Sequence, residues 1–205
     1  MSKVLTATIN DFRGYTHCSG ARPVRALSIC WRIAALSLVI VTCAIPTTTQ
    51  AQVLNEYEAK GAFLFNFVRF IEWPVNAFAD SSSPLIIGVV GDDSSSAVIE
   101  RVVNGKIANG RRLVVKRFSD FKSLTSCHIV FVRSSDRDKI RQTLTAAGPA
   151  ALTVGENEGF AKWGGIVNFT IVGGKLGLEI NQRSAERAGL KISAKLLSLA
   201  RVIKD

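Results

Sequence analysis

The sequence predicts a single α/β domain, in which a mixed β-sheet is flanked by α-helices and long helices lie at the N- and C-terminal ends of the domain. Short apolar runs rich in β-branched residues alternate with amphipathic segments, which is typical of strands and helices that pack against each other. A glycine pair between two extended runs indicates a β-hairpin. Of the 205 residues, 47% are hydrophobic, which is enough to form a sizeable core.

Residues 1–51 have the pattern of a secretory signal. Arginines precede the uncharged apolar run IAALSLVIVTCAI at 33–45, which is shorter than the roughly 20 residues that span a membrane. This length disfavours an uncleaved membrane anchor. Small residues at Thr49 and Ala51 fit a cleavage after Ala51. We therefore expect a signal peptide with an extended n-region at 1–51 and an exported, periplasmic domain at 52–205.

The basic charge of the chain persists in the expected mature domain. Residues 1–51 hold five Lys or Arg residues and one acidic residue, so the net charge of +10 for the whole chain becomes +6 for 52–205. A basic surface speeds encounter with acidic partners or anionic head groups. No basic stripe is interleaved with aromatic residues as a single-strand binder requires, so no nucleic-acid partner is expected.

The cysteines and histidines exclude several kinds of site. Only Cys127 of the four cysteines lies within 52–205, so no disulfide can form inside the mature domain. Cys127 opens an apolar run and is expected to be a small buried residue. His128 is the single histidine of the mature domain, so a zinc site and a catalytic triad both lack the residues they need. We expect no metal, no cofactor and no catalytic residues.

The first helix of the mature domain is predicted over 53–73, because Pro74 restricts the residue before it and ends the helix. Lys60 lies over the apolar face of this helix and is expected to extend its ammonium group to solvent. The large side chains of that face should be core: Phe63, Leu64, Phe67, Val68, Phe70 and Ile71.

The candidate partner-binding residues come from the two ends of the domain. Phe65 falls on the opposite side of the first helix with Arg69 and Glu72, where it is either shielded by Arg69 or offered to a partner. Lys191 and Lys195 share a face of the last predicted helix, apart from its apolar stripe. These lysines bind an acidic partner, or they lie on a solvated face.

Strands are predicted wherever short apolar runs are bounded by turn residues. The segment 166–181 reads as two strands around the pair Gly173 and Gly174, a hairpin signal. The other predicted strands are 84–90, 111–118, 127–133 and 151–155.

Helices are predicted between and after these strands. One passes through 97–103, and another begins at Ser135, which has Asp138 at the spacing of a capping box, and ends near Ala147. A long final helix is predicted from Ser184.

Two loops carry candidate sites. Phe160 and Trp163 lie in a glycine-rich loop and either line a ligand pocket or anchor the loop by packing. Asp92 and Asp93 follow a strand, where they could hold a magnesium ion for a phosphohydrolase reaction or cap the next helix.

Several stretches together resemble the YfiR family of periplasmic regulators. They occur in family order over nearly all of residues 56–201: EYEAKGAFLFNFVRFIEWP, IIGVVGDD, CHIVFV, LTVGENEGFAKWGGIVNF and LEINQRSAERAGLKISAKLLSLA. The resemblance implies a secreted α/β protein that is not an enzyme. Members bind the periplasmic sensory part of an inner-membrane diguanylate cyclase and repress it, which lowers cyclic-di-GMP and biofilm formation. It also implies a homodimer, and release by an OmpA-like outer-membrane lipoprotein.

One departure from the family pattern affects regulation. Well-described members carry disulfides, whereas this mature domain has a single cysteine, which excludes an intramolecular redox switch. The alternative hypothesis is a small-molecule-binding receptor subunit for another membrane sensor, and its pocket candidates are Phe160 and Trp163.

Overall fold

The computed structural model describes residues 48–91, 94–119, 121 and 123–204. Nearly all of the expected signal peptide lies outside the described residues, and so do Asp92 and Asp93. The described residues belong to one structural unit, which confirms the expected α/β domain with a mixed sheet. No helix within them combines the length and the apolar character that a bilayer span needs.

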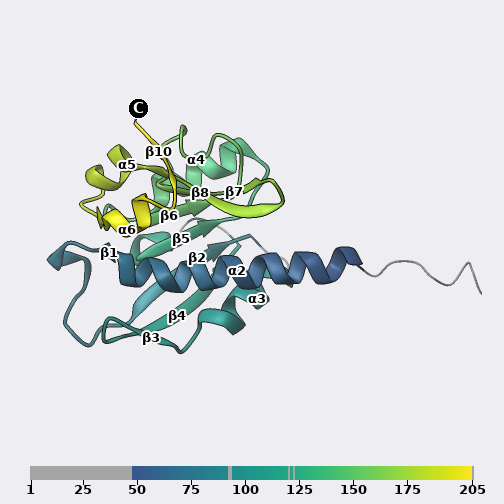
Figure 1. Ribbon diagram of the computed structural model, residues 1–205. Helices are drawn as coiled ribbons and strands as arrows, with labels where there is room; N and C mark the ends of the chain where they lie inside the picture. The colour runs from purple at the N-terminus through teal and green to yellow at the C-terminus, as the bar shows by residue number, and fades with distance from the viewer. Residues whose placement is uncertain (1–47, 92–93, 120, 122, 205) are drawn as a thin grey trace, which may run out of the picture. The chain divides into compact units, whose positions relative to one another are not determined.

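An eight-stranded sheet forms the centre of the domain, in the order β10-β8-β7-β6-β5-β2-β4-β3 (Figure 1). Neighbouring strands run parallel except for two antiparallel pairs, β7–β8 and β3–β4. The expected hairpin is confirmed as β7–β8, and both glycines of its turn have positive φ. The strands are β2 (Leu85–Val90), β3 (Ile107–Ala108), β4 (Arg111–Phe118), β5 (Ile129–Val132), β6 (Leu152–Gly155), β7 (Val167–Val172), β8 (Lys175–Asn181) and β10 (Arg201–Ile203).

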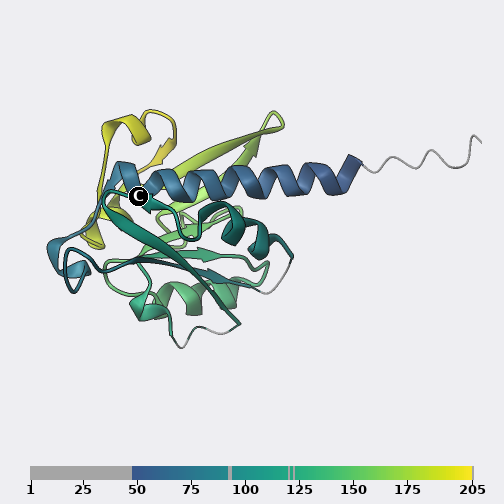
Figure 2. The same cartoon turned by 90° about the horizontal axis from the view of Figure 1, so that it is seen from below.

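Helices cover both faces of this sheet, as Figures 1 and 2 show. In β5, Ile129 and Phe131 join the larger core, which also contains side chains of α2 and α3. Val130 and Val132 point the other way and pack in a second core with Ile140 of α4. Because both faces are covered, β5 is apolar throughout and fully buried. The helices are α2 (Thr48–Phe70), α3 (Ser94–Val103) and α4 (Arg137–Ala146).

The first helix, α2, supplies much of the larger core. Its predicted core face is confirmed, with four side chains buried and Phe63 and Phe70 packed against them. The helix ends at Phe70 rather than at Trp73, because Ile71 and Glu72 form the short strand β1. At Gly61 a Cβ would lie 3.0 Å from the side chain of Val102, so the glycine permits a close crossing with α3. The four buried side chains are Leu64, Phe67, Val68 and Ile71.

The long C-terminal helix predicted from Ser184 is wrong. Gly189 adopts a φ of 69°, a left-handed conformation that ends the first short helix. The chain then pairs with β1 through β9, begins a new helix that Ser193 caps, and finally adds β10 beside β8. The segments are α5 (Gln182–Arg187), β9 (Lys191–Ile192), α6 (Ala194–Leu197) and β10 (Arg201–Ile203).

Two local expectations at the middle of the chain have different outcomes. The expected helix start at Ser135 is wrong: Asp136 is the N-cap of α4, and its side chain accepts hydrogen bonds from the backbone N–H groups of Asp138 and Lys139. The expected burial of Cys127 is confirmed, and burial raises the pKa of its thiol.

Candidate functional site

A cavity of about 470 Å³ opens at the carboxyl ends of β2, β5 and β6. Its walls are formed by α2, by the residues that directly follow these strands, and by the β7–β8 hairpin. The carboxyl ends of parallel strands are the usual place for ligand sites in open α/β sheets. We call it the charged cavity, and the polar residues that converge there are the leading candidates for function.

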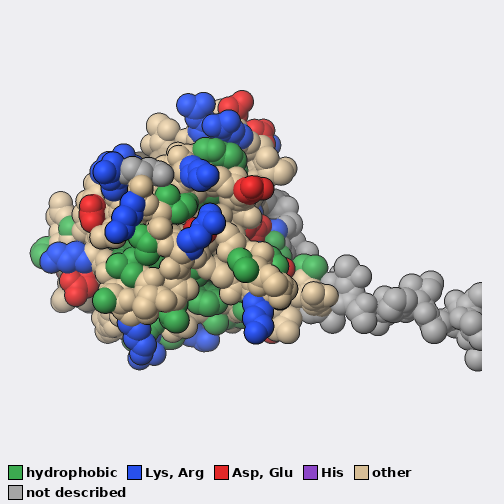
Figure 3. Space-filling model, turned by 45° about the horizontal axis from the view of Figure 1, so that its top comes forward, with side chains coloured by type: hydrophobic (Ala, Val, Ile, Leu, Met, Phe, Trp, Pro, Cys, Tyr) green, Lys and Arg blue, Asp and Glu red, His purple; other side chains and the backbone are tan. Residues whose placement is uncertain are grey.

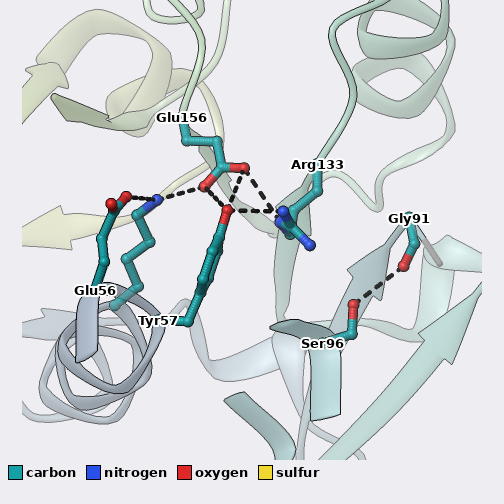
Figure 4. A network of polar contacts seen from close by, with 7 residues as sticks. Glu56, Tyr57, Gly91, Ser96, Arg133 and Glu156 are labelled. Atoms are coloured by element: carbon teal, nitrogen blue, oxygen red, sulfur yellow. Dashed lines mark hydrogen bonds and ion pairs between the residues drawn. The ribbon is translucent and has the colours of Figure 1, made fainter. Parts of the chain in front are cut away.

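Glu156 is the centre of a polar network in this cavity (Figure 4). Its carboxylate accepts hydrogen bonds from Lys60 Nζ at 2.6 Å and from Arg133 Nε at 3.1 Å. The Tyr57 hydroxyl donates to the same carboxylate at 3.2 Å and accepts from Arg133 Nη2 at 2.7 Å. Lys60 also forms an ion pair with Glu56, one helical turn earlier. The network thus joins two cations, two carboxylates and one phenol.

The ring of Tyr57 lies between the two cations of this network. Lys60 Nζ and Arg133 Cζ are each 4.4 Å from the centroid of the ring, within the range of cation–π attraction. Burial and the nearby Glu156 charge raise the pKa of Tyr57, and the two cations only partly oppose them. The phenol is therefore neutral and serves as a hydrogen-bond donor to Glu156 near neutral pH.

Lys60 is buried, with 3% of its surface exposed. The expectation that its ammonium group reaches solvent is therefore wrong. Burial by itself lowers the pKa of Lys60, but the hydrogen bonds and charges of Glu156 and Glu56 outweigh it, so the pKa is raised. Lys60 is accordingly a fixed positive charge in the cavity wall.

Local sequence features explain how these side chains meet. Lys60 comes four residues after Glu56 and three after Tyr57, so it is the neighbour of both on the surface of α2. Arg133 directly follows β5, and Glu156 directly follows β6, so both emerge at the same edge of the sheet. A polar residue directly after each of two apolar strands is a sequence signal that predicts a shared site, and the sequence-based expectations did not include it.

Gly91 allows the end of β2 to approach Arg133 closely. Its φ is 124°, and a Cβ there would lie 2.6 Å from the carbonyl oxygen of Arg133. A side chain at this position would strain the backbone and push the two strand ends apart. This glycine therefore helps to set the shape of the cavity.

Four of the five partner-binding candidates lie at the other end of α2 from this cavity. Glu72 of β1 is paired with Lys191 of β9 in a short antiparallel ladder. Lys195 Nζ lies 5.6 Å from the ring centroid of Phe70, the residue after the exposed Arg69. We call this area the β1–β9 surface; it comprises Arg69, Glu72, Lys191 and Lys195.

Phe65, the fifth candidate, is placed differently from the expectation. Its ring is half-buried and packs against the larger core. The cation over the ring is Lys106, at 5.4 Å from the centroid. The structure therefore shows Phe65 covered by Lys106 and not by Arg69. It also shows that α2 is buried on a wider side than its predicted apolar face.

The aromatic residues of the glycine-rich loop are anchors in the structure. Phe160 is fully buried in the second core, and its ring fits between Gly155 and Gly165, where a Cβ at either glycine would overlap it. Trp163 is half-buried, with Arg137 Cζ 4.8 Å from its ring centroid. Neither aromatic residue lines the charged cavity, whereas Glu156 and Asn157 of the same loop do.

The remaining chemistry of the described residues is limited. No group of three His, Cys, Asp or Glu side chains among them is arranged to hold a metal ion. On the face in Figure 3, Lys and Arg side chains are scattered among uncharged ones and form no continuous basic stripe.

Comparison with known protein families shows to which family the chain belongs. The family model described as YfiR/HmsC-like matches residues 57–201. The chain belongs to the YfiR/HmsC-like family. Membership confirms the resemblance that the sequence motifs indicated, and it supports a periplasmic regulator role in general terms. The match begins at Tyr57, so it includes the residues of the charged cavity from Tyr57 onward and the β1–β9 surface.

Other comparisons are more distant. No curated protein matches this YfiR/HmsC-like chain. Among solved structures, it is similar to a conserved domain protein from Vibrio cholerae O1 biovar El Tor strain N16961, with 15% sequence identity and a TM-score of 0.48. The similarity covers 72% of this chain and 60% of that one.

Proposed function

We propose that this protein is a non-enzymatic periplasmic regulator that binds the periplasmic sensory part of an inner-membrane diguanylate cyclase and represses it. Repression lowers cyclic-di-GMP and biofilm formation. The observation that carries the proposal is membership of the YfiR/HmsC-like family over residues 57–201. The signal pattern in residues 1–51 supports export, with cleavage near Ala51.

The physical mechanism is a difference in affinity. A regulator shifts the equilibrium of its partner only by the difference between its binding to the inactive and the active state. The protein therefore binds the inactive sensory part more tightly. An OmpA-like outer-membrane lipoprotein relieves repression by competing for the regulator, which acts as a homodimer.

The β1–β9 surface is the proposed contact with the cyclase. Lys191 and Lys195 are exposed. The ladder between β1 and β9 places Lys191 opposite Glu72, and Lys195 of α6 lies beside Phe70 at the end of α2. Charges placed on short strands and helices that are packed together present a fixed pattern to a partner, which favours specificity and fast association.

The test is capture of inner-membrane proteins by the purified protein, followed by their identification. We expect recovery of a protein with a diguanylate cyclase output domain, and loss of that recovery with the double variant Lys191→Glu/Lys195→Glu. The matched control, Lys139→Glu/Lys162→Glu, makes the same change in charge at exposed lysines elsewhere and should leave recovery unchanged. Recovery of no inner-membrane sensor would count against the proposal.

A second candidate function is supported by the charged cavity. A small-molecule-binding receptor subunit for another membrane sensor would use a concave site with convergent polar groups, and the cavity has both features. Recovery of a membrane sensor without a cyclase domain would favour this candidate.

A further inference from the structure

We infer that a small apolar pocket beside the β1–β9 surface receives one large apolar side chain of the membrane partner, and that acidic residues flank this side chain in the partner. The inference rests on the proposed function and deepens it, because it names the kind of segment that the regulator binds. The pocket lies between α5, β9 and α6, at the end of the domain where β1 is found (Figure 1). We call it the α5–β9 pocket; its walls are Ala185, Leu190, Ile192 and Leu197, and its rim is Gln182, Glu186 and Lys191.

The walls of the α5–β9 pocket are apolar. Ala185 and Leu190 are buried, with 1% and 3% of their surfaces exposed. Ile192 and Leu197 are partly buried and pack against the larger core. Water gains little from such walls, so an apolar side chain that displaces it is favoured. Apolar anchors in pockets of this kind supply much of the affinity of protein interfaces.

The volume of the pocket favours a single side chain as its occupant. It is about 190 Å³, below the roughly 300–1,000 Å³ that is typical of small-molecule sites. At roughly 30 Å³ for each molecule of liquid water, this volume corresponds to about six waters. A leucine or a residue of similar size can displace them, whereas most of a larger ligand would stay outside.

Backbone hydrogen bonds fix the walls before a partner arrives. Gly189, with a φ of 69°, ends α5, and the Leu190 N–H donates to the Ala185 carbonyl at 2.9 Å. After β9, the Ser193 N–H donates to the Phe70 carbonyl at 2.9 Å. The segment that contains β9 is therefore attached to α5 at one end and to α2 at the other. A pocket that is already formed loses little conformational freedom on binding.

The charges around the pocket favour an acidic segment. Glu186 accepts a hydrogen bond from Gln182 Nε2 at 3.0 Å within α5, whereas Lys191 is exposed at the rim. The pocket elements α5, β9 and α6, together with β1 and the last turn of α2, carry five exposed cations and two exposed carboxylates. A surface with this surplus of three positive charges speeds association with acidic segments and disfavours basic ones. The cations are Arg69, Arg183, Arg187, Lys191 and Lys195, and the carboxylates are Glu72 and Glu186.

NMR titration of the isotope-labelled protein tests the pocket with defined peptides. The probe is a blocked five-residue peptide with a central leucine and two aspartates on each side. One control has alanine at the centre, and a second has lysines in place of the aspartates. We expect the backbone N–H signals of Leu190 and Ile192 to shift and saturate, with a dissociation constant on the order of millimolar for a peptide of this size.

The two control peptides separate the apolar anchor from the acidic flanks. The alanine peptide should bind about tenfold more weakly or worse, because most of the apolar area that leucine buries is missing. The lysine peptide should also bind more weakly, because its charges are repelled. Absence of saturable shifts at the pocket, or equal binding of either control peptide, would refute the inference.

A blocking variant gives an independent check. Glu186→Trp places a ring at the exposed rim and removes a negative charge, so charge alone predicts tighter binding of the acidic peptide, whereas a filled pocket predicts its loss. We expect the loss. Glu158→Trp makes the same change at an exposed position outside the pocket and should bind normally. Thermal melting checks that both variants are folded, and unchanged binding by folded Glu186→Trp would overturn the inference.

A second variant tests the charge of the rim without filling the pocket. Lys191→Gln should weaken binding of the acidic peptide about threefold, because one attractive charge is lost at the rim. Lys162→Gln removes an exposed positive charge elsewhere and should leave binding unchanged. Equal effects of the two variants would contradict a specific role of the rim.

The peptide titrations need no membrane partner, so failure of the pocket and failure of cyclase capture are distinguishable. Loss of cyclase capture by Glu186→Trp but not by Glu158→Trp would support the pocket as the contact. Capture that Glu186→Trp leaves unchanged would overturn the pocket while the proposed function stands. Peptide binding at the pocket without capture of any inner-membrane sensor would support the pocket and count against the cyclase as its partner.

Discussion

Lys60 on α2 and Glu156 after β6 form an ion pair with Nζ and Oε2 2.6 Å apart, although the residues are 96 positions apart in the sequence. The pair attaches the N-terminal half of α2 to the edge of the sheet. Because Glu156 also accepts from Arg133, this one carboxylate contacts two poorly solvated cations. Its loss should therefore cost more than the loss of an ordinary surface pair.

We predict that Glu156→Gln lowers the free energy of unfolding by about 2–4 kcal/mol, because it leaves Lys60 and Arg133 with reduced compensation. Urea unfolding at neutral pH measures the change. Glu58→Gln is the control, since Glu58 pairs with Arg101 through side chains that are 49% and 66% exposed, and it should cost less than about 1 kcal/mol. Equal losses of unfolding free energy in the two variants would show that the network stabilises the fold no more than a surface ion pair does.

His128 makes the stability sensitive to acid. Its Nδ1 accepts from the Ile86 N–H at 3.0 Å, so the proton of the neutral ring is on Nε2, which donates to the Ala77 carbonyl at 3.0 Å. Burial lowers the pKa of His128, the Arg111 charge lowers it further, and the bond to Ala77 opposes them. Protonation of Nδ1 would also break the bond from Ile86.

The lowered pKa fixes the direction of the pH effect. The unfolded chain binds a proton near pH 6.5 and the folded protein only at lower pH, so this stabilisation is complete above about pH 6.5 and is lost as the pH falls through the folded pKa. Between about pH 7.5 and 5, the wild type should therefore lose more unfolding free energy than His128→Gln, which cannot titrate. Parallel losses in urea titrations of the two proteins would contradict this role.

The sequence was sufficient for elements whose burial follows from their own pattern. The strands β2 and β5 are predicted because continuous apolar runs are typical of strands covered on both faces. The core face of α2 followed from helical spacing, and the β7–β8 turn followed from Gly173 and Gly174. In each of these elements, local residues and tertiary packing favour the same structure.

The structures of the C-terminal region and of the cavity depend on contacts between residues that are far apart in the sequence. The spacing of Ile192 and Leu196 fits a helix, but Ile192 pairs with Ile71 of β1, which no local pattern reveals. Lys60 seemed a lysine that extends to solvent because its partner, Glu156, is close only after the sheet has formed. Helical spacing predicts where the charged residues lie on α2, but it does not predict which residues form the opposite wall of the cavity.

The fit of Phe160 between two glycines predicts a strong effect of a single methyl group. We expect Gly165→Ala to cost about 1–3 kcal/mol, because the new Cβ would overlap the ring in a filled core. Phe160→Leu should relieve part of that overlap, so the double variant should be less destabilised than the sum of the single changes. Additive costs in thermal or urea unfolding would mean that the alanine acts through the backbone rather than through Phe160.

Substitution of Phe65 distinguishes a role in the core from a role in partner binding. Because its ring is half-buried against the larger core and lies under Lys106, Phe65→Ala should lower the free energy of unfolding by about 1–2 kcal/mol, less than for a fully buried phenylalanine. Phe65→Leu keeps most of the apolar contact and should cost less. Capture of the membrane partner is then compared at a temperature where all three proteins are folded. Unchanged stability together with weakened capture would instead assign the ring to a partner surface on α2.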